Sequence, residues 1–146
     1  MKIRIFYILL LAIGIYLPTQ AQNDSILIIN GDTISLKEPE IFDRAEINPS
    51  FPGGPYELSK FLAKNIHFDS KAAKEKGISG KIIVRFYIDV DGSVKNPVII
   101  KDIPGSDLGE EIIRVCNIMP KWTPGQQRGK TVKVYYTLPV TLTNNS

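Results

Sequence analysis

The chain has 146 residues, of which 43% are hydrophobic and 23% charged, so it is long enough for one globular domain and wholesale disorder is excluded. Its single cysteine, Cys116, excludes an intramolecular disulfide, and the apolar neighbours of Cys116 predict a buried thiol. Beyond residue 21 there are 16 basic and 15 acidic residues, and this near-neutral charge gives no electrostatic argument for nucleic-acid binding.

The first 21 residues have the three-part layout of a secretory signal peptide. Lys2 and Arg4 form a basic start, residues 5–17 carry no charge, and the stretch ends at the small residue Ala21. We therefore predict a signal peptide over residues 1–21, with export and cleavage after Ala21. The uncharged run is shorter than the roughly 20 residues that span a bilayer. Its retention as a membrane anchor is the alternative, and membrane contact is expected only in that case.

Residues 22–50 are expected to form a small β-hairpin and a linker. Asn30-Gly31 lies between two apolar runs and tolerates the positive φ angles of a type I′ turn, so residues 25–36 predict a two-stranded ribbon. Prolines and a Gly-Gly pair favour an extended linker over residues 37–54. The stretch 22–50 holds two basic and six acidic residues, so it could lie against the more basic remainder or stay a separate solvated surface.

Hydrophobic periodicity predicts a domain of helices and strands over residues 51–146. Helical spacing of apolar residues predicts helices at 55–65 and 70–76. Alternation predicts a strand at 81–89, and an Asp-Gly turn returns the chain antiparallel at 94–101. A third helix, with one apolar stripe, is expected at 106–119.

The last strand has the clearest pattern of the chain. One face carries Val132, Val134, Tyr136, Leu138, Val140 and Leu142. The other face carries Lys133, Tyr135, Thr137, Pro139 and Thr141. This period of two predicts a half-buried strand. Because Pro139 here and Pro97 in the return strand cannot donate to a ladder, both strands are expected at edges, with 81–89 central in a three-stranded antiparallel sheet. The predicted fold class is α+β.

The residues give little support for an enzyme, a cofactor or a metal site. His67 is the only histidine, whereas catalytic and metal sites need several converging groups. Residues 125–131 resemble a phosphate-binding loop, but they lead into a strand, whereas such a loop must open a helix. Glu110 and Glu111 are neighbours on a helix and therefore point in different directions. We expect no catalytic residue, no cofactor and no metal ion.

Trp122, the only tryptophan, lies in a Pro-Gly loop beside the edge strand. It could plug the core under the end of the last helix, or it could be an exposed anchor for a partner. The plug is favoured, because a tryptophan next to a helix terminus most often caps a core. Tyr135, on the polar face of the last strand, is the better candidate for contact with a partner.

Many short motifs in register resemble the TonB C-terminal domain family, in the form common among Bacteroidetes-type sequences. They are Phe51-Pro-Gly-Gly54, Phe61-Leu62, Asn65-Ile66, Ala72, Gly77-Ile-Ser-Gly80, Asp91-Gly92, Met119-Pro-Lys-Trp122, Pro124-Gly125, Gly129-Lys130 and Leu138-Pro139. The resemblance covers about residues 48–143. It implies two helices packed on a three-stranded antiparallel sheet.

The resemblance also implies a non-enzymatic function in energy-dependent transmembrane transport. Members of the family act in the periplasm and bind the TonB box, a short segment of outer-membrane receptors, which adds as a strand to the C-terminal strand, here Val132 to Leu138. A second contact corresponds to Asn65–Asp69, where Phe68-Asp69 replaces the family's Tyr-Pro. The partner-binding residues that we predict are Val132, Val134, Tyr135, Tyr136, Thr137, Leu138, Asn65, Phe68 and Trp122.

Three functions remain open at this point. The first is an energy transducer, for which residues 5–17 would stay as an anchor in the inner membrane. The second is a soluble periplasmic adaptor or competitor that binds the same peptides, or other envelope proteins, without transmitting force. The third is a cell-envelope enzyme, which is disfavoured because no nucleophile, base and orienting group can be named together. Exposed edges can also pair with each other, so a homodimer through the last strand is an alternative.

Overall fold

The computed structural model describes residues 25–29, 32–36 and 39–143, in two compact units, Met1–Pro39 and Glu40–Ser146. In the first unit, β1 (Ser25–Ile29) and β2 (Asp32–Leu36) pair antiparallel, as the hairpin pattern predicts. The Asn30-Gly31 turn and the expected signal peptide lie outside the described residues. Within the described residues, no helix is both long and apolar enough to cross a membrane.

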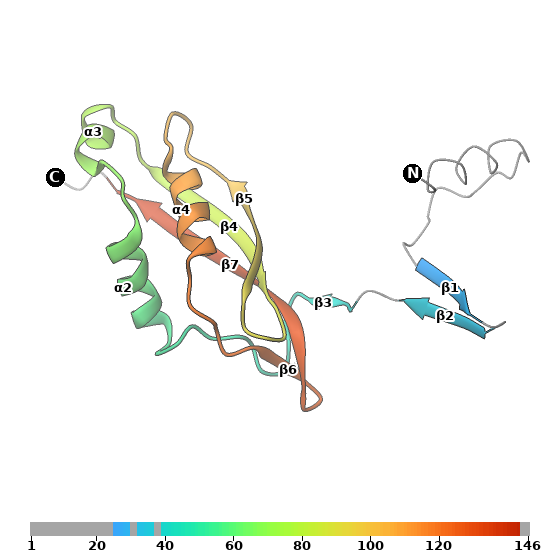
Figure 1. The fold of residues 1–146 in the computed structure, drawn as a ribbon. Coiled ribbons are helices and arrows are strands. Elements are labelled where there is room, and N and C mark those ends of the chain that lie inside the picture. The colour runs from blue at the N-terminus through green and yellow to red at the C-terminus, as the bar shows by residue number, and fades with distance from the viewer. Residues whose placement is uncertain (1–24, 30–31, 37–38, 144–146) are drawn as a thin grey trace, which may run out of the picture. The chain divides into compact units, whose positions relative to one another are not determined.

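The second unit holds the helices and the larger sheet (Figure 1). Its elements in chain order are β3 (Ile41–Phe42), α2 (Pro55–Asn65), α3 (Ser70–Glu75), β4 (Gly80–Ile88), β5 (Val94–Lys101), α4 (Leu108–Asn117), β6 (Gly125–Gln127) and β7 (Lys130–Leu142). The ranges predicted for α2 and β5 are confirmed, and the other predicted elements differ by at most two residues at each end.

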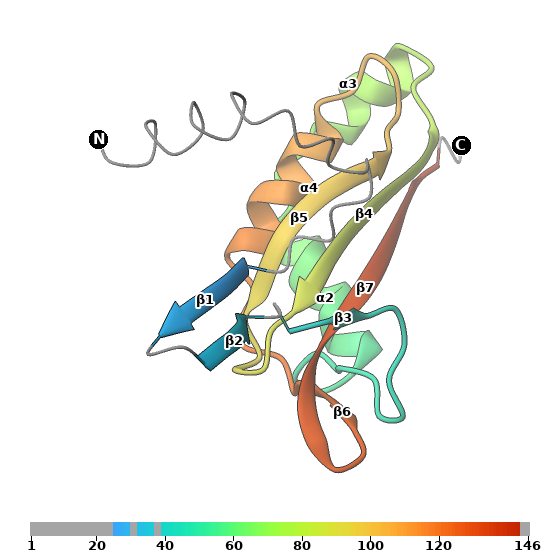
Figure 2. The same cartoon turned by 90° about the vertical axis from the view of Figure 1, so that its right-hand side faces the viewer.

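The sheet has the strand order β3-β7-β4-β5. The predicted antiparallel centre is confirmed, because β4 pairs antiparallel with β5 on one side and with β7 on the other. The structure adds β3, which runs parallel to β7, and β6, which forms a hairpin with β7, so the sheet is mixed. Helices α2, α3 and α4 lie on one face, so three helices, not the two implied by the resemblance, cover the sheet (Figure 2).

Local capping explains where the helices begin and end. Pro55 stands in the first turn of α2, where its missing N–H costs nothing. The Asp69 carboxylate accepts the N–H of Ala72 at 2.9 Å and so begins α3 as a separate helix. Gly77, with φ of 68°, ends it in the left-handed region that glycine favours. Before α4, the Ser106 side chain accepts the N–H of Leu108, the first residue of that helix, at 3.1 Å.

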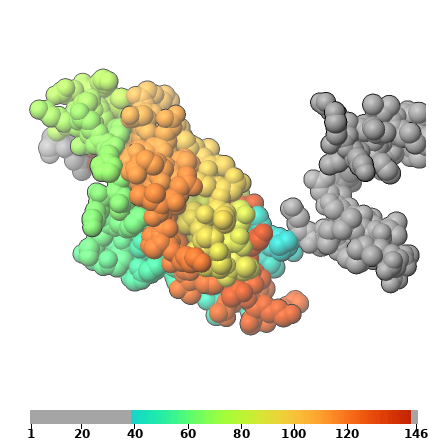
Figure 3. Space-filling view, viewed as in Figure 1, coloured from blue at the N-terminus to red at the C-terminus, as the bar shows by residue number. Residues whose placement is uncertain are grey.

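The core lies between the sheet and the helices. Alternate residues of β4 and one stripe of α4 supply half of the buried hydrophobic residues that the structure describes, namely Ile82, Val84, Phe86, Ile88, Leu108, Ile112, Val115 and Cys116. Figure 3 shows α4, in orange, between the green α2 and α3 on one side and the yellow strands on the other. The prediction of a buried thiol is confirmed, since Cys116 is 1% exposed and burial raises its pKa to about 12.

Trp122 is a core residue, and its second predicted role as a partner anchor is therefore corrected. It is 4% exposed, and its indole ring meets Phe51, Phe86 and Tyr136 at centroid distances of 5.5, 5.7 and 4.8 Å. Its backbone N–H donates to the carbonyl of Gly92 at 2.8 Å. A Cβ at Gly92 would lie 2.1 Å from the Trp122 carbonyl oxygen, so only glycine allows this approach between the β4–β5 turn and the loop before β6.

Residues 40–50, which we expected in the linker, pack on the domain. Ile41 and Phe42 pair with β7, and Ile47 and Ser50 form antiparallel bridges to Gln126 and Thr123. The proline-rich composition correctly indicates an extended backbone. It does not reveal that this extended backbone finds partners, because those partners lie more than 70 residues away in the sequence.

The β6–β7 hairpin was not predicted. Its two turn residues, Arg128 and Gly129, have φ of 52° and 73°, as a type I′ turn requires. The Arg128 N–H donates to the Glu46 carboxylate at 3.1 Å, and the Glu46 N–H donates to the Gln127 side chain at 2.9 Å. Glu46 therefore holds an arginine in a conformation that it rarely adopts.

Replacing Trp122 with alanine tests its role in the core. We expect Trp122→Ala to lower the free energy of unfolding by about 3–5 kcal/mol, because a large buried ring is removed and leaves a cavity. The measurement is urea unfolding followed by circular dichroism. Tyr56→Ala is the control, since Tyr56 is 72% exposed and should change stability by less than about 0.5 kcal/mol. Equal urea midpoints for Trp122→Ala and wild type would contradict the packing role.

Candidate functional site

The sheet has two rims, and the β5 rim is irregular. The pairing of β4 with β5 shifts register between Ile83 and Val84 and again between Arg85 and Tyr87. Within β5, Asn96 has φ of 51° and Pro97 has no N–H to donate. Bulges and prolines interrupt the row of backbone groups that a further strand would need. The β5 rim is therefore a poor template for strand addition.

The β7 rim is regular. β7 pairs one to one with β4 from Val134 to Leu142 without a register shift. On the side away from β4, the two residues of β3 pair with Lys133 and Val134. Beyond Val134, none of the described strands pairs with that side, and Figure 2 shows β7 as the rim of the sheet there. The predicted edge of Val132 to Leu138 is therefore open only from Tyr135 onward.

The side chains of the predicted edge divide between the two faces of the sheet. Val134 and Leu138 are buried at 1% and 4% exposure, and Val132 is half-buried. The Tyr136 ring stacks on Phe86 at 5.4 Å and meets Trp122 edge-on at 4.8 Å, and its burial raises the pKa of the phenol. These core-side residues can offer a partner only their backbone. Tyr135 and Thr137 alternate with them and lie on the face without helices.

Tyr135 is the centre of a small aromatic and cationic cluster on this open face. The guanidinium carbon of Arg85 lies 3.9 Å from the centroid of the Tyr135 ring, and the Tyr87 ring meets it edge-on at 6.2 Å. The ammonium of Lys133 lies 5.6 Å from the Tyr87 ring. Arg85 also donates a hydrogen bond to the carboxylate of Asp43, directly after β3.

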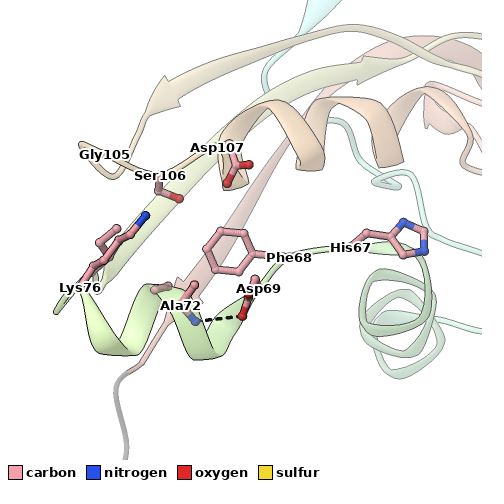
Figure 4. A pocket seen from close by; sticks show the side chains of 10 residues that line it. His67, Phe68, Asp69, Ala72, Lys76, Gly105, Ser106 and Asp107 are labelled. Carbon is pink, nitrogen blue, oxygen red and sulfur yellow. Dashed lines mark hydrogen bonds between the residues drawn. The ribbon is translucent and has the colours of Figure 1, made fainter.

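The second predicted contact, Asn65–Asp69, lies on a different surface. The Asn65 side chain donates to the Phe61 carbonyl at 2.8 Å and so closes the end of α2. Phe68 projects into a cavity of about 200 Å³ between α3 and the start of α4 (Figure 4). The cavity is lined by His67, Phe68, Asp69, Ala72, Ala73, Lys76, Ile78, Gly105, Ser106 and Asp107. None of these residues belongs to β7, so the structure does not join the two predicted contacts in one pocket.

Two charged residues of α4 hold this connection between α2 and α3. The Glu111 carboxylate accepts the backbone N–H of His67 at 2.7 Å, and Arg114 donates to the Asn65 carbonyl at 2.6 Å. Arg114 also donates to Glu111 at 2.6 Å. Hydrogen bonds from Arg114 and His67 lower the pKa of Glu111 to about 2. Glu111 is thus an acceptor that positions the segment before Phe68, and it is not one of a catalytic carboxylate pair.

Over the described residues there is no group of three or more His, Cys, Asp and Glu side chains that could hold a metal ion. From Tyr135 to Leu142, β7 pairs with β4 on one side, and none of the described strands pairs with its other side. Residues 70–142, half of the chain, match the model of the family "Gram-negative bacterial TonB protein C-terminal". The chain belongs to this family.

The TonB C-terminal family is a family of non-enzymatic transducer domains. Two NMR solution structures of the Helicobacter pylori TonB C-terminal domain are similar to this chain. One is 21% identical, with 62% of this chain and 94% of that chain covered and a TM-score of 0.43. The other is 22% identical, with 62% and 83% covered and a TM-score of 0.42. No curated protein matches the chain.

The low pKa of Glu111 predicts how stability changes with pH. Because the pKa falls from 4.5 to about 2 on folding, the stabilisation by ionised Glu111 is complete above pH 4.5 and is lost as the pH falls towards 2. We expect Glu111→Gln to be less stable than wild type at pH 7 and to converge with it in thermal melts at pH 2. Glu110→Gln removes a neighbouring exposed charge and is the control. Parallel pH profiles for wild type and Glu111→Gln would contradict this role.

Proposed function

We propose that this chain is a periplasmic protein-binding module that takes up an extended segment of TonB-dependent outer-membrane receptors by strand addition to β7. In this proposal it works in energy-dependent transport across the outer membrane, as the TonB type of energy transducer does. Binding requires no catalytic group and no cofactor, since backbone hydrogen bonds supply the affinity and alternate side chains supply the selectivity.

The open rim of β7 carries this proposal. From Tyr135 onward β7 keeps a regular ladder with β4 on one side and has no described strand on the other. The opposite rim is broken by two register shifts. Pro139 has no N–H, so the most useful part of the open rim is Tyr135 to Leu138. A docked strand would there lie beside the side chains of Tyr135 and Thr137 on the open face.

The second proposed contact is the surface around Phe68. The end of α3 leads directly into β4, and Gly80 at the start of β4 pairs with Leu142 at the end of β7. A receptor that docks along β7 would therefore reach the region of α3 at the C-terminal end of that strand. The aromatic ring of Phe68, beside the polar groups of Ser106 and Asp107, offers it an apolar contact.

Strand addition is tested with backbone-methylated peptides. The probes are synthetic peptides that cover the N-terminal segments of outer-membrane receptors of the TonB-dependent type. We expect at least one of them to shift the NMR amide signals of Tyr135 to Leu138. The same peptide with methyl groups on alternate backbone nitrogens should bind about tenfold more weakly or not at all, because it cannot donate to the ladder.

A variant of the protein tests the same ladder by removing a donor from β7 and not from the peptide. The pairing of β7 with β4 continues through Pro139 although proline has no N–H, so we infer that the backbone of β7 faces away from β4 at this position. Because this direction alternates along an antiparallel strand, the N–H of Thr137 should also face away from β4. Thr137→Pro should therefore weaken peptide binding and keep the core, which circular dichroism checks, whereas Thr137→Val keeps the N–H and should bind normally. Peptides that bind equally well to all three proteins would contradict docking on this rim.

The alternative function is an adaptor or competitor that binds the same segments without transmitting force. The expected cleavage after Ala21 favours it. The intact mass of the native protein from the envelope fraction of its own cells distinguishes the two. A mass that starts at Gln22, in protein that washes off the membrane, supports the adaptor. A mass that includes residues 1–21, in protein that stays with the inner membrane, supports the transducer. Concentration-dependent sedimentation would reveal a homodimer through β7.

A further inference from the structure

The two positions of β7 directly before the open rim, Lys133 and Val134, are paired with the chain's own strand β3. β3 contributes only Ile41 and Phe42, and these pair parallel with Lys133 and Val134 (Figure 2). A peptide of more than about four residues that docks beside Tyr135 to Leu138 would therefore meet β3. We propose that residues 41–43 are a built-in competitor for this rim, and that the partner segment that displaces them carries an acidic residue bound by Arg85. This inference rests on the proposed function.

Arg85 is the residue that would bind the acidic side chain of the partner. Its guanidinium stacks on Tyr135 of the rim strand and donates to the carboxylate of Asp43. Continuing the parallel register by one step sets Asp43 beside Tyr135, which explains how a carboxylate on a neighbouring strand reaches Arg85 on β4. The chain thus displays, in its own residues, the geometry that a partner strand would take: an apolar pair followed by an acid.

The charge of the open face favours the same partner chemistry. β4, β5 and β7 contain no acidic residue. The register of these strands places five basic residues on the open face, namely Lys81, Arg85, Lys95, Lys101 and Lys133. Of the described residues, Asp43 is the acid that pairs with a cation of this face. When β3 leaves, Arg85 is left with an unmatched charge, and a partner carboxylate restores the pair.

β3 is held weakly enough to exchange. Neither Ile41 nor Phe42 is fully buried, and the Asp43 side chain is 84% exposed, where ion pairs stabilise little. The firm attachment begins after Asp43. Ala45 is buried and its N–H donates to the Asn48 side chain at 3.1 Å, while Glu46 is tied to the β6–β7 hairpin. Residues 41–43 can therefore leave the rim while the following segment stays, and as a tethered strand they compete at high effective concentration.

The test compares two peptides on the full chain and its variants. The probes have the sequence of residues 39–45, with blocked ends, and carry either the native aspartate or an asparagine at the position of Asp43. Asp43→Asn in the protein weakens the internal competitor and should tighten binding of the aspartate peptide a few-fold. The Asp43→Asn protein should bind the aspartate peptide a few-fold more tightly than it binds the asparagine peptide. Adding Arg85→Gln to this protein should abolish the difference between the two peptides.

Controls and readouts separate this inference from the proposed function. Arg44→Gln changes the neighbouring exposed charge and should leave peptide affinity unchanged. Binding should shift the amide signals of Tyr135 to Leu138 together with that of Phe42, which reports the release of β3. If the rim signals shift but the Phe42 signal and the Asp–Asn preference do not change, the inference is wrong and strand addition stands. If neither these peptides nor receptor peptides shift the rim signals, both are wrong.

Discussion

The structure depends on a constraint on β7: from Tyr135 onward, the described strands pair with only one of its two rows of backbone groups. β4 satisfies one row from Val134 to Leu142, and from Lys133 onward the other row has, among the described strands, the two residues of β3. The burial of Val134 and Leu138 under the helices fixes which side chains face the core, because a slip by one residue would turn them to water. The open row is therefore presented in a defined register.

The parts of this arrangement that follow from local physics could be predicted from the sequence. The alternation in β4 and β7 sets their buried faces, and the helical spacing of Leu58, Phe61 and Leu62 sets α2. Pro97 and Pro139 correctly placed β5 and β7 outside β4. Trp122 also follows the rule that an aromatic residue at a helix end packs inward, so of its two predicted roles the structure supports the core plug and not the partner contact.

The parts that depend on distant residues could not be predicted. Ile41-Phe42 is too short for a periodic pattern, and it becomes a strand only because β7 offers unpaired backbone groups 92 positions later. The β6–β7 turn needs Arg128 in the left-handed region, which its propensity disfavours and which Glu46, 82 residues away, stabilises. An Arg-Gly pair two residues wide before a strongly alternating strand is a weak hairpin signal that could have suggested β6.

An open strand edge is useful and hazardous for the same reason, since any extended chain can pair with it. The two rims of this sheet meet the hazard differently. In β5, bulges and Pro97 disable the edge permanently. In β7, Pro139 limits the open row at one end, and β3, a half-buried strand of two residues, borders it at the other. If β7 is the docking strand that we propose, a permanent block would remove the docking site along with the hazard. A weak internal strand limits pairing to chains that bind better than it does, so protection of the edge and selection of a partner become the same equilibrium.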